Sequence, residues 1–144
     1  MIIHTLRMVG KLKKILQRKD FQIVTLFVLF DLLLTDIGIT LGYGKEGNLL
    51  AAIFTHSLGL MLLEIIISIL ILLFLFSILK GVLRRAYASF QIGASMIGIV
   101  SWITQILIEI PEKFGPELAT LFVIWSSIGM IASIFTFIYF GKNK

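Results

Sequence analysis

The side chains of this sequence that could do chemistry are ionisable residues embedded in long apolar segments: Asp31, Asp36, His56, Glu64 and Glu109. Charge inside a bilayer is costly, so such residues are functional candidates by default. No Lys or Arg lies within the same apolar cores. These five residues are therefore the first places to look for function.

Three states of the intramembrane acids are physically open. They could stay protonated and donate hydrogen bonds between helices, share protons with one another or with His56, or be ionised and hold a cation through their oxygens. The chain has no cysteine, which excludes disulfides, thiolate metal sites and thiol nucleophiles. It also has neither a G-x-S-x-G nor an H-E-x-x-H motif. We therefore predict no metal and no cofactor.

The helical spacing and depth of these residues define two levels in the membrane. Asp31 and Glu64 fall near its middle, and Thr35 lies one turn from Asp31 on a stripe that continues through Gly38 and Gly42. The second level, near the outer face, comprises Asp36, Glu46, Asn48, His56 and Glu109. Asn48 is also a good helix N-cap, so Glu46 and Asn48 could instead cap a helix and hold a hairpin.

Four apolar segments must position these side chains. Of the 144 residues 58% are hydrophobic and 15% are charged, whereas a soluble domain has about 45–50% and about 25%. A spanning helix needs about 20 apolar residues, and the candidates are 23–41, 49–79, 88–110 and 118–140. The second is longer than one crossing requires, so either it tilts or 49–57 forms a separate turn or re-entrant piece. These segments predict an all-α, four-helix transmembrane bundle.

The basic residues predict the orientation of the bundle. Eleven of the 13 Lys and Arg residues lie before the first span, in the loop after the second, or after the fourth. The other two, Lys45 and Lys113, lie in the loops on the opposite side. This asymmetry predicts a multi-pass cell-membrane protein with both termini in the cytoplasm. Four spans exclude a soluble nucleic-acid-binding protein despite the net charge of +5.

The chain divides into a basic amphipathic segment, 1–20, and a four-span domain, 21–144. Apolar residues recur at helical spacing through 2–19 with lysines between them, which predicts a helix lying on the cytoplasmic surface against anionic lipid. A disordered basic arm is the alternative. We expect the membrane-surface residues to be Lys11, Lys13, Lys14, Arg18, Lys19, Arg84 and Arg85.

Spans three and four carry stripes of small and polar residues, which allow close helix approach and hydrogen bonds between helices. The packing residues expected from these stripes are Gly98, Ser101 and Gln105 in span three and Ser126, Gly129 and Ser133 in span four. Bundle packing is the interpretation we favour for both stripes.

The first hairpin, F-D-L-L-L-T-D-I-G-I-T-L-G-Y-G-K-E-G-N-L-L, resembles a family of small archaeal and bacterial membrane proteins classed only as a domain of unknown function. That family has D-x-x-x-T, a glycine-rich turn, and E-x-N-P before span two. Asp31, Thr35, Glu46 and Asn48 match, whereas Leu49 stands in place of the proline. The resemblance covers about 30 residues. It implies a compact helical bundle with its site at these four residues, and it implies no activity.

Three functions fit these observations. The first, which we favour, is a non-catalytic subunit, assembly factor or scaffold acting by helix packing, with lipids and another membrane protein or a second copy as partners. The second is a transporter or channel component that moves protons or cations through the mid-membrane acids. The third is an intramembrane enzyme on a lipid substrate, with Asp36, Glu46, His56 and Glu109 as acid, base or metal ligands.

Overall fold

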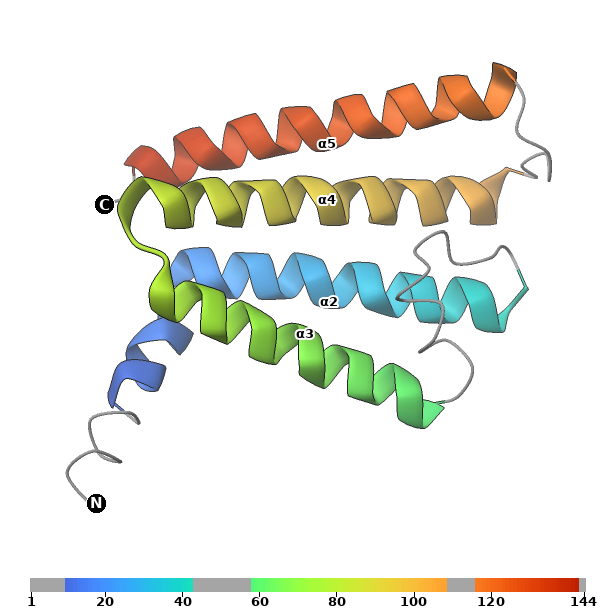
Figure 1. Cartoon of the computed structure of the whole chain (residues 1–144). Coiled ribbons are helices and arrows are strands. Elements are labelled where there is room, and N and C mark those ends of the chain that lie inside the picture. Colours follow the sequence, from blue (N-terminus) through green and yellow to red (C-terminus); the bar gives the residue numbers. More distant parts are fainter. Residues whose placement is uncertain (1–9, 43–57, 109–115, 143–144) are drawn as a thin grey trace.

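A computed structural model describes residues 10–42, 58–108 and 116–142 of the chain. These residues are almost entirely helical, which confirms the all-α fold. The long helices are α2 (Lys19–Thr40), α3 (Leu58–Ile78), α4 (Gly81–Leu107) and α5 (Pro116–Lys142) (Figure 1). All four are long and apolar enough to cross a membrane, so the chain is a polytopic membrane protein.

Helix α4 begins earlier than the hydropathy predicts. The expected span begins at residue 88, but the helix begins at Gly81, and only two residues separate it from the end of α3. Arg84 and Arg85, which we expected in a loop, therefore lie in the first turns of α4. The reason is that hydropathy marks the depth of lipid and not the start of a helix, and arginine is a good helix former.

Helix α2 begins at Lys19, four residues before the expected start of its span, and ends at Thr40, one residue before the expected end. Helix α5 extends the predicted span by two residues at each end, with Pro116 as its first residue, where a missing N–H costs nothing. Helix α3 begins at Leu58. The question of whether 49–57 belongs to the second span falls outside the described residues.

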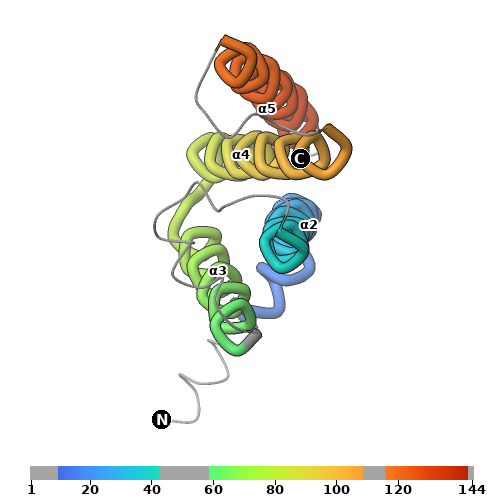
Figure 2. Tube along the Cα trace, turned by 90° about the vertical axis from the view of Figure 1, so that its right-hand side faces the viewer, coloured from blue at the N-terminus to red at the C-terminus, as the bar shows by residue number. Residues whose placement is uncertain are grey.

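The helices pack in a row in which α4 is central. Helix α5 packs along one side of α4 and α2 along another, while α3 contacts mainly α2 (Figures 1 and 2). Helices α2 and α4 run in the same direction, although α3 separates them in the sequence. The bundle therefore depends on a parallel pair of helices that are not consecutive.

The four helices meet at one end of the molecule, which we call the basic end. It contains the start of α2, the end of α3, the start of α4 and the end of α5 (Figure 1). Every Lys and Arg of the described residues lies at this end. Basic residues that lie in separate parts of the sequence are thus brought together at one end of the bundle.

The hydrophobic core also lies towards the basic end. Phe21 of α2 and Phe76 of α3 pack edge to face with ring centroids 5.2 Å apart, and Tyr87 of α4 extends the contact. Buried residues from all four helices join them: Val24, Val28, Leu72, Ala88, Ile92 and Phe140. Away from this end α3 splays from α2, and its other half keeps most of its apolar side chains exposed (Figure 1).

Candidate functional site

The mid-membrane acid Asp31 lies against the backbone of α4. A Cβ atom added to Gly98 would collide with Asp31 Oδ1 and would lie 2.7 Å from its Cγ and 2.8 Å from its Oδ2. The carboxyl group of α2 thus occupies the space that a side chain at position 98 would need. Gly98, expected to serve helix packing, does so by receiving this acid; we call the pair the intramembrane contact.

The stripe that contains Asp31 faces α4 over about two turns. Thr35, one turn further along α2, is buried. Gly38 lies under the indole of Trp102, since a Cβ atom at Gly38 would clash with that ring. Asp31 and Thr35 therefore belong to a tightly packed helix interface.

The other described candidate acids lie on α2 and α3. Asp36 is buried near the outer end of α2, where its backbone carbonyl accepts a hydrogen bond of 2.7 Å from Thr40 Oγ1. Glu64, on α3, is partly buried. Measured from the basic end, Asp31 and Glu64 are about 18 Å and about 21 Å along their helices at about 1.5 Å per residue. The two acids therefore lie at similar distances from the basic end, measured along their own helices.

Several candidates cannot be placed in this site. Glu46, Asn48, His56 and Glu109 lie outside the described residues. The second level, nearer the outer face, is therefore represented here by Asp36 alone. Within the described ranges, no group of three His, Cys, Asp or Glu residues is placed to hold a metal ion.

Helices α4 and α5 approach each other closely at a pair of glycines, Gly93 and Gly129. A Cβ atom at Gly93 would lie 2.6 Å from the carbonyl oxygen of Gly129, and the reverse distance is also 2.6 Å. Beside this crossing, Ser133 Oγ donates a hydrogen bond of 2.9 Å to the carbonyl of Ser89. Gly129 and Ser133 were among the expected packing residues. Ser89 and Gly93 were not, although their small-x-x-x-small spacing is a sequence signal for close helix packing.

The remaining predicted packing residues contribute less directly. Ser101 Oγ donates to the carbonyl of Gly98 within α4, at 2.8 Å. Gln105 and Ser126 are partly buried. Towards the outer end, the indole N–H of Trp125 donates to Thr104 Oγ1 at 3.3 Å and links α5 to α4.

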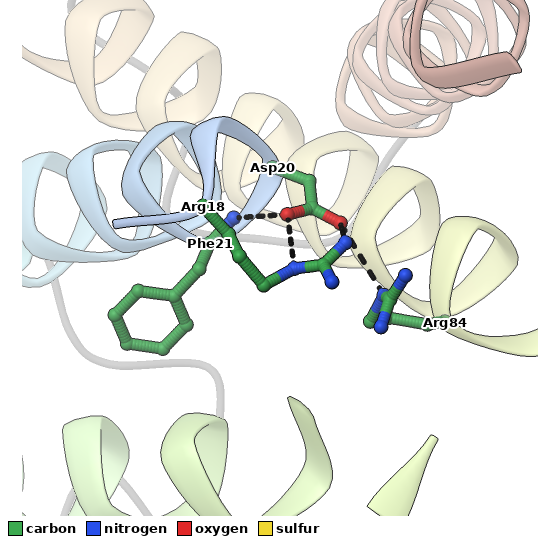
Figure 3. A network of polar contacts seen from close by, with 4 residues as sticks. All are labelled: Arg18, Asp20, Phe21 and Arg84. Carbon is green, nitrogen blue, oxygen red and sulfur yellow. Dashed lines mark hydrogen bonds and ion pairs between the residues drawn. The ribbon is translucent and has the colours of Figure 1, made fainter. Parts of the chain in front are cut away.

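A charged cluster of Arg18, Asp20 and Arg84 joins α2 to α4 at the basic end (Figure 3). Arg18 binds the Asp20 carboxylate through two hydrogen bonds, Nε to Oδ1 at 3.0 Å and Nη2 to Oδ2 at 2.8 Å. Arg84 Nε lies 3.4 Å from Oδ2, an ion-pair distance. The backbone N–H of Phe21 also donates to Oδ1. Because the carboxylate is buried and satisfied from three directions, the cluster is structural.

Asp20 is the residue that sequence reasoning missed. It lies next to the predicted span and was not counted among the intramembrane acids. Arg18 and Arg84, expected on the membrane surface, both bind it. Of the other expected surface residues, the four lysines are exposed: Lys11, Lys13, Lys14 and Lys19. Arg85 lies over the Phe137 ring of α5, 5.5 Å from its centroid.

No protein-family model, curated protein or solved structure matches the chain.

Proposed function

We propose that this chain is a non-catalytic membrane protein that acts by helix packing, as a subunit, assembly factor or scaffold. The observation that carries the proposal is the intramembrane contact, where the Asp31 carboxyl is packed onto the Gly98 backbone inside a helix interface. A carboxyl group used in this way holds α2 against α4. We place the basic end, and with it both termini, at the cytoplasmic face.

Helix α3 lies at one end of the row of helices and contacts mainly α2, which supports it as the helix that binds a partner. Its buried apolar residues, Leu72 and Phe76, both lie near the basic end. In the outer half, large apolar side chains are exposed: Leu62, Leu63, Ile66 and Ile67. We propose that another membrane protein packs along this half of α3.

Photo-crosslinking in native membranes tests this proposal. The chain has no cysteine, so a single introduced cysteine can carry a photoreactive label at a unique position. The label is placed at Ile66 of α3 or, as a matched control, at Phe135 of α5. Both side chains are exposed, at 54% and 70%. We expect one discrete protein adduct from Ile66 and none from Phe135. An adduct of twice the chain's mass would identify the partner as a second copy, and lipid adducts alone at both positions would contradict the proposal.

Proton or cation movement is the second candidate, because Asp31 and Glu64 lie on different helices at one level. Asp31→Asn separates the two functions, since it keeps the size of the side chain but removes the acid. If packing is the function, the Ile66 adduct survives this change. If the purified chain carries an ion flux in proteoliposomes and Asp31→Asn abolishes it, the second candidate is correct.

A further inference from the structure

A short basic helical segment, residues 10–16, precedes α2 and projects from its start at the basic end (Figure 1). It is fastened to the bundle at its last turn. Ile15 packs against the hydrophobic core, and Gln22 Nε2 of α2 donates a hydrogen bond of 3.0 Å to the carbonyl of Leu16. The segment therefore has a defined position on the bundle.

The charged cluster fixes the turn between this segment and α2. The backbone N–H of Arg18 donates to the carbonyl of Ile15 at 3.0 Å, while its guanidinium binds Asp20. Arg84 of α4 reaches the same carboxylate. The buried Asp20 carboxylate therefore binds Arg18, which precedes α2, and Arg84, which belongs to α4. These contacts fix the direction in which the segment leaves the bundle relative to α4.

The rest of the segment is amphipathic and faces outward. Leu12 and Leu16 are 43% and 45% exposed, although they lie on the apolar face with Ile15. Lys11, Lys13 and Lys14 are also exposed. The segment thus leaves two leucines and three lysines exposed.

The surroundings of the segment are positively charged. Lys19, Lys80, Arg85 and Lys142 lie at the same end of the bundle. Asp20 is the single acid that the described residues place there, and it already binds two arginines. A partner of negative charge with an apolar interior would satisfy both the lysines and the exposed leucines.

We propose that residues 10–16 bind the surface of an anionic phospholipid bilayer. Leu12 and Leu16 enter the boundary between headgroups and acyl chains, and Lys11, Lys13 and Lys14 bind headgroup phosphates. Asp20 and its two arginines are positioning residues that hold the segment at the height of the bilayer surface. Arg18 and Arg84 do not contact lipid in this arrangement, since their guanidinium groups face Asp20.

Fluorescence quenching in reconstituted vesicles tests the proposal. A polarity-sensitive dye is attached at Leu12→Cys, which is a unique site because the chain has no cysteine. Quenching by neutral acrylamide is compared in phosphatidylcholine vesicles with and without about 30% phosphatidylglycerol, at about 0.1 M and about 1 M salt. We expect severalfold weaker quenching with the anionic lipid at low salt, and loss of this protection at high salt.

Two triple variants, each of which removes three positive charges, show which lysines are responsible for the protection from quenching. Lys11→Gln, Lys13→Gln and Lys14→Gln together should abolish the protection, because each lysine near an anionic surface contributes about fivefold to binding. Lys19→Gln, Lys80→Gln and Lys142→Gln together should retain most of it. Equal quenching in the two vesicle types, or equal loss in both triple variants, would overturn the proposal. The test uses lipid alone, so its outcome is independent of any partner of α3.

Discussion

Two aspartates of α2 point towards the same neighbour, α4, and meet opposite surroundings. At the basic end Asp20 meets Arg84 and, through its own turn, Arg18. Three turns further into the membrane, Asp31 meets a glycine. Near the interface water and headgroups tolerate cations, so an acid can be held by charge. At mid-membrane depth an arginine would be costly, and the carboxyl of Asp31 packs against a position of α4 that has no side chain.

The difference has a consequence for what each contact specifies. The charged cluster tolerates small movements, because ion pairs act over several ångströms. The intramembrane contact does not, because a carboxyl group fills a space the size of a missing side chain. We therefore expect substitutions at the intramembrane contact to cost more than loss of the charge at Asp20.

The largest expected effect is that of Gly98→Leu. The new side chain would occupy the position of the Asp31 carboxyl and force α2 from α4, at a cost of about 3 kcal/mol of unfolding free energy. The measurement is unfolding in mixed detergent micelles, followed by the fluorescence of Trp102 and Trp125. Gly59→Leu is the control, since no atom lies within 4 Å of a Cβ at Gly59.

A double substitution sharpens the same test. Asp31→Ala removes the group with which a side chain at position 98 collides, so adding it to Gly98→Leu should restore part of the lost stability. If the two costs simply add, the two residues are not in contact and the comparison fails.

The next effect is that of Asp20→Asn. The amide keeps the size of the side chain and can still accept the Phe21 N–H, but Arg18 and Arg84 would then repel each other. We expect a loss of about 1–2 kcal/mol, below the value for a fully buried pair because both arginines are partly exposed. Glu117→Gln is the matched control, an exposed acid in the first turn of α5, and should change stability by less than about 0.5 kcal/mol. Equal losses in the two variants would show that the cluster does not join the helices.

The smallest effect is that of Ser133→Ala. It removes the hydrogen bond to the Ser89 carbonyl but leaves the Gly93–Gly129 approach intact, so the expected loss is about 0.6 kcal/mol. Ser127→Ala serves as the comparison because Ser127 is exposed and bonds only to the Val123 carbonyl of its own helix. A loss of several kcal/mol in Ser133→Ala would mean that polar bonding and not close approach holds α5.

The parts of the fold that follow from local patterns were predictable. Hydropathy located all four spans, and helical spacing placed Asp31, Thr35 and Gly38 on one stripe. The identity of the neighbouring helix was not predictable, because no periodicity records that α2 lies beside α4. The cluster of Arg18, Asp20 and Arg84 was missed for that reason. Arg84 is far from Arg18 and Asp20 in the sequence and joins them only once those two helices run in parallel.

The central position of α4 also bears on how the chain is made. During synthesis α2 and α3 emerge before α4, so α2 enters the bilayer ahead of the helix it packs against most extensively. Until Gly98 arrives, the carboxyl of Asp31 must be tolerated by the insertion machinery, by water or by α3. The packing of α2 is therefore expected to be completed late in membrane integration, when the third span enters.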